Sequence, residues 1–494
     1  MRHIRTGSLA ICAAELAAIL LSSTLASFAA EDGQPSLPSM LRDITDVGGI
    51  RSALEKAGVR FTFTYFGDAF ANPVGGVKQG VGYDGRFGTI IDADLEKILG
   101  WQGASFHASI HQIHGTQFSA TNLSNLMTVS GIEAPPSTRL FNLWIEQKIG
   151  GDLNLRIGQF TAAQEFLTSA NANLFVNSTF GWPMAAAQDL PSGGPAYPEA
   201  TPGLRLTWTP NDRLTLRAAI FDGDPAGPGP GNPVQRDPFG LAFRVNDPPF
   251  VIVETAYGWG EQTADKSVAP GNPNQEGVDI DGGRPRHAAS AEANLAGSLK
   301  LGAWVHTGAF ADQRLDSQGE LLAATKGAPL QHRGNLAAYA IVDQELWRVP
   351  GQGSRALNGF LRVSASPSDR NPVDLYADGG LTFNGPLAAR PDDFIGLGLA
   401  WGRISPLAQS YDRDLIALTG QGMPIRDYEL ALELTYQWKI ATNWMIQPDL
   451  QVILHPGGHL PLPAVMSGSG LSLASASAAI PDALVLGVRT FVKF

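Results

Sequence analysis

The sequence predicts an all-β chain that crosses a membrane as an antiparallel β-barrel of about sixteen strands, with a short N-terminal periplasmic helix. Hydrophobic or small side chains occupy every second position from 484 to 492, the opposite face carries Arg489 and Lys493, and the stretch ends in Phe494. The same alternation recurs along the chain. After residue 29 no apolar run reaches the roughly 18 residues that a spanning helix needs. Strands with one apolar and one polar face suit a barrel with lipid outside and water inside.

Residues 1–29 are predicted to be a cleavable signal peptide that exports the chain. Two arginines precede an apolar run over residues 9–25, and residues 27–29 (SFA) resemble an A-x-A cleavage site. The single cysteine of the chain, Cys12, lies in this segment. The exported protein therefore has no thiol for a disulfide, a thiolate metal site or a nucleophile.

Residues 30–58 are predicted to lie in the periplasm and to contain a short helix, because Ile50, Leu54 and Ala57 recur at helical spacing. Residues 59–494 are predicted to form the barrel. The alternation is clear in eight segments, at 59–65, 87–96, 106–111, 141–148, 153–157, 204–208, 214–220 and 428–439. The longest of them reach about ten residues, the length of a tilted membrane strand, whereas strands of soluble sheets average about five or six.

Long irregular stretches rich in Gly, Pro, Asn and Asp separate some of the strands, notably at 222–238, 260–287 and 312–334. In outer-membrane barrels short turns face the periplasm and long loops face outside. These three stretches are therefore predicted to be external loops.

Residues 161–201 form the longest interruption of the alternation. Phe175, Phe180 and Trp182 lie there among small and polar residues, a composition that argues against disorder. A loop of this length in a compact domain usually has a function. Two interpretations stay open: the loop folds into the lumen and constricts it, or it forms an external lid.

Composition and motifs exclude several classes of function. The formal net charge is −11, and it becomes −12 after removal of residues 1–29, which carry two arginines and one glutamate, so nucleic acid is not an expected partner. His107 and His111 share a strand face but lie about 13 Å apart, too far to bind one metal ion. Residues 279–282 resemble part of a calcium loop without its final glutamate. The sequence predicts no metal, no cofactor and no Gly-x-Ser-x-Gly catalytic elbow.

Four runs resemble the OprB-type carbohydrate-selective porins: residues 155–183, 191–206, 221–229 and 428–458. The terminal strand adds to the resemblance, which extends from about residue 41 to residue 494. It implies a sixteen-stranded barrel in the bacterial outer membrane that passes carbohydrates, glucose-like monosaccharides in particular, by passive diffusion. The implied partners are carbohydrate solutes, outer-membrane lipid and lipopolysaccharide, and the barrel-assembly machinery through Phe494. The oligomeric state implied is a monomer or a trimer.

Strand parity then selects residues that could line the lumen and contact a sugar. Hydroxyl groups need polar donors and acceptors, and the apolar faces of sugar rings stack on aromatic side chains. The candidates on polar faces near the long loop are Asn142, Trp144, Glu146, Lys148, Arg156, Arg205 and Arg217, with Glu433 and Lys439 across the lumen. Interspersed charges of both signs would bind hydroxyls without selecting one ion type. Each residue could equally form a salt bridge that holds the wall or the loop.

Three other functions stay open: a non-selective porin, an adhesion or receptor barrel with a closed lumen, and an outer-membrane lipid hydrolase. The hydrolase would need a catalytic group at the outer surface of the barrel. A closed receptor barrel would not conduct ions. The alternation and the resemblance favour a sugar-permeable channel rather than an enzyme.

Overall fold

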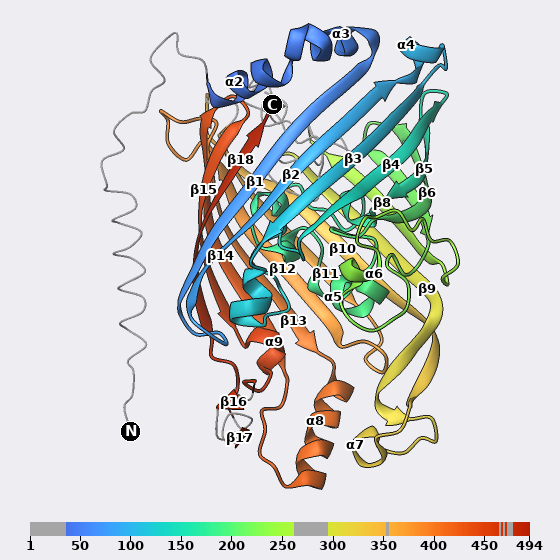
Figure 1. Ribbon diagram of the computed structural model, residues 1–494, viewed down its shortest axis with the longest axis vertical. Helices are drawn as coiled ribbons and strands as arrows, with labels where there is room; N and C mark the ends of the chain where they lie inside the picture. The colour runs from blue at the N-terminus through green and yellow to red at the C-terminus, as the bar shows by residue number, and fades with distance from the viewer. Residues whose placement is uncertain (1–35, 261–294, 352–354, 464–465, 468–469, 472–477) are drawn as a thin grey trace.

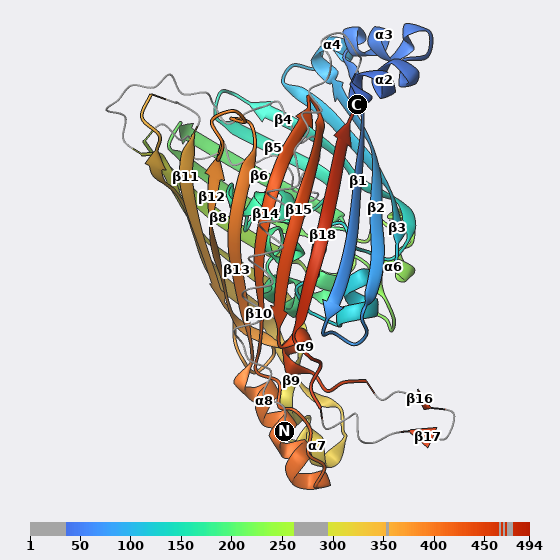
Figure 2. The ribbon, with the colours of Figure 1, turned by 90° about the vertical axis from the view of Figure 1, so that its left-hand side faces the viewer.

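The computed structural model describes residues 36–260, 295–351, 355–463, 466–467, 470–471 and 478–494. In this part of the chain, sixteen long strands form a closed antiparallel barrel (Figure 1, Figure 2). Each strand pairs with its neighbour in the sequence, and β18 closes the barrel between β15 and β1. This confirms the predicted fold class. The predicted signal peptide and the calcium-like stretch 279–282 lie outside the described residues.

The barrel strands have the following bounds: β1 Val59–Val74, β2 Gly80–Asp94, β3 Ala104–Gly115, β4 Ser137–Ile149, β5 Leu153–Phe160, β6 Thr201–Asn211, β7 Leu214–Phe221, β8 Phe250–Trp259, β9 Gly297–Asp316, β10 Pro329–Arg348, β11 Ala356–Ala365, β12 Val373–Asn384, β13 Phe394–Ile404, β14 Tyr428–Ala441, β15 Trp444–Leu454 and β18 Ala483–Lys493. Two short strands, β16 Met466–Ser467 and β17 Gly470–Leu471, pair with each other outside the barrel.

Short helices lie before the first strand and in the connections. The α-helices are α2 Leu37–Thr45, α3 Ile50–Ala57, α4 Leu95–Leu99, α5 Met184–Asp189, α6 Pro233–Arg236, α7 Leu322–Thr325, α8 Pro406–Thr419 and α9 Pro456–His459. Further single turns are η1 Val47–Gly49, η2 Ser119–Leu123, η3 Ala162–Gln164, η4 Ala172–Leu174, η5 Ser178–Phe180 and η6 Pro191–Gly193. None of the described helices is long and apolar enough to span a membrane. Helices α2 and α3 confirm the expected N-terminal helix.

The period of two gives each strand an apolar outer face and a polar inner face. Large apolar side chains are exposed on the outside along many strands, as lipid contact requires. Examples are Leu204, Leu206, Val253, Leu301, Val305, Leu361, Val363, Leu397, Leu399, Leu432, Leu434 and Val488. The intervening polar side chains face the lumen, where loops bury many of them.

The C-terminal residue takes part in barrel closure. The backbone N–H of Phe494 donates to the carbonyl oxygen of Phe63 at 2.9 Å, and the N–H of Phe63 donates back at 2.8 Å. The two rings lie 5.7 Å apart. The alternation at the end of the chain therefore continues directly into the ladder with β1.

One of the three stretches predicted to be external loops, 260–287, lies outside the described residues except for Gly260. Successive strands of the barrel run in opposite directions. The end of β8 and the start of β9, which pair through Trp259 and Gly297, therefore lie at the barrel end that carries α2, α3 and the short turns. Residues 261–294, which connect these two strands, lie outside the described residues.

Strands occupy about half of the stretch 312–334, at 312–316 and 329–334. β9 runs to Asp316 and β10 begins at Pro329, and each strand has 20 residues. The hairpin extends beyond the other strands at the outer end of the barrel (Figure 1). Polar contacts replace the apolar alternation there: Arg314 on β9 binds Asp414 on α8 at 2.7 Å, and His332 on β10 binds Asp312 at 2.7 Å.

Candidate constriction site

The loop between β5 and β6, residues 161–200, folds into the barrel and crosses to the opposite wall. Its residues hydrogen-bond to inward-facing side chains on four distant strands. These contacts are Leu167 N to Glu254 on β8 at 3.2 Å, Ser169 Oγ to Asp343 on β10 at 2.6 Å, Thr179 Oγ1 to Tyr376 on β12 at 2.8 Å, and Val176 N to Glu433 on β14 at 2.6 Å. We call this segment the lumen loop.

Arg362 on β11 holds two parts of the lumen loop at once. Its fully buried guanidinium donates to the carbonyl oxygens of Leu167 and, at 2.8 Å, Thr179, and it forms an ion pair with Asp378 on β12. A charge at such a depth is costly unless it is paired and hydrogen-bonded. Here the loop carbonyls and Asp378 supply those partners.

Apolar packing attaches the same loop to the wall. The rings of Phe175 and Phe180 lie 4.5 Å apart, and both pack near Phe360 on β11. Gly396 and Gly398 on β13 leave room for them, since a Cβ at either position would come within 2.8 Å of a loop side chain. Loop and wall therefore form one hydrophobic core.

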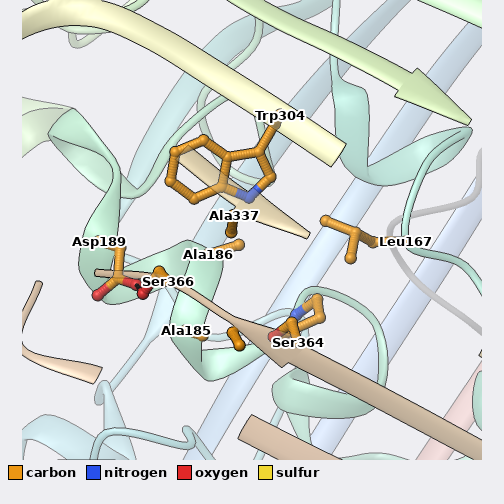
Figure 3. Close-up of a pocket in the computed structure, with 10 residues that line it drawn as sticks. Leu167, Ala185, Ala186, Asp189, Trp304, Ala337, Ser364 and Ser366 are labelled. Carbon is orange, nitrogen blue, oxygen red and sulfur yellow. Dashed lines mark hydrogen bonds between the residues drawn. The ribbon is translucent and has the colours of Figure 1, made fainter. Parts of the chain in front are cut away.

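A small cavity shows how closely the loop fits (Figure 3). It lies between Leu167 and α5 on the loop side and Trp304 and Ser364 on the wall side, and it measures about 10 Å³. That volume accommodates about one water molecule. No sugar could pass between loop and wall at this point.

A second loop, residues 116–136, also enters the lumen. The backbone N–H groups of Leu126 and Met127 donate to Glu429 on β14 at 2.8 and 2.6 Å, and Gln451 on β15 donates to the carbonyl oxygen of Val129 at 2.8 Å. The two loops together cover the wall made by β10 to β15 and β18.

Charged residues converge on the other wall, where β4, β5 and β6 face the base of the lumen loop. The register places Glu146 opposite Arg156 and Arg156 opposite Arg205, so all three point inward. Glu165 of the lumen loop completes the group. Arg156 binds Glu146 at 2.7 Å and Glu165 at 2.6 Å, and Arg205 binds the same two carboxylates at 2.7 and 2.6 Å.

Arg217 and Glu254 adjoin this group. The guanidinium of Arg217 donates to the backbone carbonyl of Glu165 at 3.3 Å and lies 3.7 Å from the carboxylate of Glu254. We call the six residues Glu146, Arg156, Glu165, Arg205, Arg217 and Glu254 the Arg–Glu cluster. Three guanidinium groups and three carboxylates give it a formal charge of zero.

The surroundings of Glu165 keep it ionised. Burial acts to raise the pKa of this carboxyl. The charges of Arg156, Arg205 and Arg217 lower the pKa by more than burial raises it, so that it falls to about 2. Opposite charges within a few ångströms favour the ionised form in this way. Glu165 is therefore ionised across the physiological pH range.

Trp144 fixes the position of Arg156. The guanidinium carbon lies 3.8 Å from the indole centroid, and the ring of His107 stacks on the indole at 4.7 Å from the neighbouring strand on the other side. Gly158, with φ +143°, lies opposite Trp144, where a Cβ would collide with the backbone of Leu143. Both faces of the indole are covered by protein groups, so it presents only its edge to a solute.

The other predicted site residues lie apart from the cluster. Asn142 is buried on β4. Lys148 is exposed near the short turn that follows β4. Glu433 is buried beneath the lumen loop and accepts hydrogen bonds from Val176 N and Asn177 N. Lys439 lies near the short-turn end, with its amino group 3.5 Å from Asp392.

Sequence reasoning missed Glu165, the carboxylate at the centre of the cluster. A signal was present, because Glu165 is the only charged residue between positions 161 and 188. It also missed that His107, dismissed as a metal ligand, stacks on Trp144 and binds Asp92 at 2.8 Å. Neither contact follows from strand parity alone.

Comparison with known proteins identifies the family. A profile described as "Carbohydrate-selective porin, OprB family" matches residues 78–494. Porin B of Pseudomonas aeruginosa is 26% identical over 472 residues, which cover 90% of this chain and 93% of that protein. The high pH structure of Pseudomonas putida OprB shares the fold, with a TM-score of 0.73 and 22% identity over 91% of this chain and 97% of that one. Its low pH structure matches the same shares with a TM-score of 0.50 and 17% identity. The chain is therefore a bacterial outer-membrane β-barrel that belongs to the carbohydrate-selective porin, OprB family.

Proposed function

We propose that this porin lets glucose-like monosaccharides diffuse passively down their gradient, and that the Arg–Glu cluster forms its constriction. The position and partial exposure of the cluster carry this proposal. Loops pack against the opposite wall, while the side chains of Arg156 and Glu146 stay 15% and 17% exposed. The path of the solute then runs along β4 to β6.

The chemistry of the cluster suits neutral polyols. Guanidinium groups donate and carboxylates accept hydrogen bonds in fixed planes, so a sugar can exchange bonds to water for bonds to the wall. Balanced charge gives no strong preference for an ion of either sign. Asn154, which donates to Glu146 at 3.0 Å and accepts from Arg205 at 2.7 Å, adds a neutral partner. Binding of this kind is weak enough for the solute to leave.

Liposome swelling with the refolded full chain tests the proposal. We expect glucose to enter faster than an amino acid of similar size, and a disaccharide to enter more slowly. Equal rates for glucose and the amino acid would indicate a non-selective porin. Absence of swelling with a folded barrel would indicate a closed receptor barrel or an enzyme.

Variants test the constriction separately. Arg156→Ala and Glu146→Ala should each change glucose entry several-fold and shift the ion selectivity, because each unbalances the charge of the cluster. Lys439→Ala is the matched control, since it removes a lumen-side charge distant from the cluster. Wild-type flux and selectivity in both cluster variants would remove these residues from the constriction.

We further propose that residues 1–29 are removed on export, and that residues 30–58 stay in the periplasm at the end of the barrel 59–494. The barrel-assembly machinery would recognise the strand that ends in Phe494. The apolar outer face would contact outer-membrane lipid, with lipopolysaccharide at the external rim. Loss of assembly on Phe494→Ser would support this role of the terminal residue; normal assembly would contradict it.

A further inference from the structure

Two histidines and an aspartate meet at the external rim of the barrel, far from the Arg–Glu cluster. Asp427 directly precedes β14, whereas His455 and His459 follow β15. β14 and β15 pair up to Leu430 and Leu454. The ladder therefore brings the residues at its outer end side by side.

The three side chains direct ligand atoms towards one another. One ligand atom from each lies within 4.8 Å of the others. His455 Nδ1 is 2.8 Å from Asp427 Oδ1, and His459 Nδ1 is 3.8 Å from Asp427 Oδ2. The two imidazole rings stack at 4.3 Å with an angle of 14°.

A simple hydrogen-bonded pair explains only part of this arrangement. The contact of His455 with Asp427 is a normal hydrogen bond. The 3.8 Å separation of His459 from the second carboxylate oxygen is too long for one. A metal ion between the three groups would bind all of them, since their ligand atoms already lie within 4.8 Å of one another.

The backbone holds both histidines in place without a metal. They lie in the left-handed region, with φ +53° and +74°, and the intervening Gly457 and Gly458 have φ +71° and +74°. The N–H of Gly457 donates to Glu429 at 2.7 Å, and the N–H of Asp427 donates to the carbonyl oxygen of Gly458 at 3.0 Å. Glycine adopts such angles freely, whereas histidine does so at a cost that the surrounding contacts offset.

From this geometry we propose that Asp427, His455 and His459 bind one divalent transition-metal ion, with Zn²⁺ as the reference ion. Two imidazoles and one carboxylate are typical ligands of Zn²⁺, Ni²⁺ and Cu²⁺, whereas Ca²⁺ and Mg²⁺ prefer oxygen ligands alone. The three side chains are between 25% and 37% exposed, so solvent reaches the site and a water molecule completes the coordination.

The metal would connect two external loops. Asp427 ends the loop that contains α8, and His455 begins the loop that contains α9. An ion bound at all three residues would fasten these loops to each other at the mouth of the channel. It would not enter the path of the solute along β4 to β6.

Isothermal titration of ZnCl₂ into the refolded, chelator-treated full chain without an affinity tag tests the proposal. We expect saturable binding with one ion per chain. Loss of a group that only supports a ligand typically weakens metal binding roughly 10- to 100-fold. His459→Asn removes a ligand itself, so it should weaken binding by at least that factor. Asparagine tolerates the left-handed backbone, so this variant should fold.

His332→Asn is the matched control. His332 binds Asp312 at 2.7 Å and lies 3.9 Å from Asp369, so it is a histidine beside two carboxylates. Within the described part of the chain it does not belong to a three-ligand group. Zn²⁺ affinity should be unchanged in this variant. The d–d absorption of Co²⁺, bound in place of Zn²⁺, should report the imidazole ligands in the wild type and weaken in His459→Asn. Absence of saturable binding to the wild type, or equal affinity in His459→Asn, would overturn the proposal. Glucose entry is measured separately in liposomes. The outcome of the Zn²⁺ titration therefore neither supports nor contradicts the proposed channel function.

Discussion

Glu165 and Asp189 lie in the same loop inside the barrel, Glu165 with 12% of its side chain exposed and Asp189 buried, but their surroundings are opposite. Glu165 meets three guanidinium groups, which hold its pKa at about 2 despite burial. The hydrogen-bond donors to the Asp189 carboxyl within the described residues are neutral, Ser366 Oγ at 3.0 Å and Val373 N at 3.2 Å. Burial therefore raises the pKa of Asp189 well above its usual range, and the nearby charge of Asp374 raises it further.

The contrast separates two tasks of the lumen loop. Glu165 adds a permanent negative charge to the Arg–Glu cluster, whose formal charge is zero. This cluster lies on the wall along which we propose that the solute passes. At Asp189 it uses a carboxyl group only as a hydrogen-bond acceptor that attaches α5 to β12. A carboxylate among cations and a carboxyl among neutral donors respond differently to the same substitution, which makes the comparison testable.

The largest effect is expected from Arg362→Met, because Arg362 anchors both parts of the loop. The substitution leaves Asp378 buried without its cation, which should lower the free energy of unfolding by about 3–5 kcal/mol. Urea titration of the refolded barrel in detergent measures this. The double variant Arg362→Met/Asp378→Asn should recover part of the loss; equal stability of the single variant and the wild type would show that the pair does not anchor the loop.

Glu165→Gln should have the next largest effect. The shift of its pKa from 4.5 to about 2 corresponds to about 3 kcal/mol of favourable interaction with the arginines. The variant also gives the cluster a net positive charge, so planar-bilayer recordings should show a shift towards anion selectivity. Unchanged reversal potentials would place the cluster outside the ion path.

Asp189→Asn, the same exchange at the other end of the loop, should cost less than about 1 kcal/mol. The amide oxygen can still accept from Val373 N, and the Ser366 hydroxyl can accept from the amide nitrogen. Selectivity should stay as in the wild type. A loss as large as that of Glu165→Gln would mean that Asp189 acts as a charge, and the comparison would fail.

The smallest effect is expected from mild acid. Because the folded-state pKa of Glu165 lies below 4.5, its ionised form stabilises the protein above about pH 4.5, and this stabilisation is lost as the pH falls towards 2. The contribution of Glu165 to glucose entry should therefore stay constant between pH 7 and pH 5. A change in wild-type glucose entry between pH 7 and pH 5 that does not occur in Glu165→Gln would contradict the low pKa of Glu165.

Local pattern was enough to predict most of the barrel. Alternation with a period of two revealed the strands and their inner faces, and register then brought Glu146, Arg156 and Arg205 together. Strand parity shows which side chains face the lumen. It does not show where along the barrel axis such a side chain lies, or whether a loop packs over it. For that reason Glu433, which lies beneath the lumen loop, and Lys439, at the short-turn end, were grouped with residues that they do not meet.

The path of the lumen loop could not be predicted from local sequence. It depends on contacts between residues far apart in the chain, such as Val176 with Glu433 and Leu167 with Arg362. The proposed metal site at Asp427, His455 and His459 escaped prediction for a similar reason. His455 and His459 are close in sequence, but Asp427 joins them only through the hairpin of β14 and β15.

Barrel closure has a consequence for the order of assembly. The seam joins the first strand to the last. Thr64 lies opposite Lys493, and the backbones of Phe63 and Phe494 are hydrogen-bonded to each other. Contacts with so large a sequence separation form slowly, because a long chain segment must be ordered before they can be made. Until β18 arrives, the edge of β1 exposes unpaired backbone groups that invite aggregation. The nascent chain should therefore depend on a periplasmic chaperone until β18 has paired with β1.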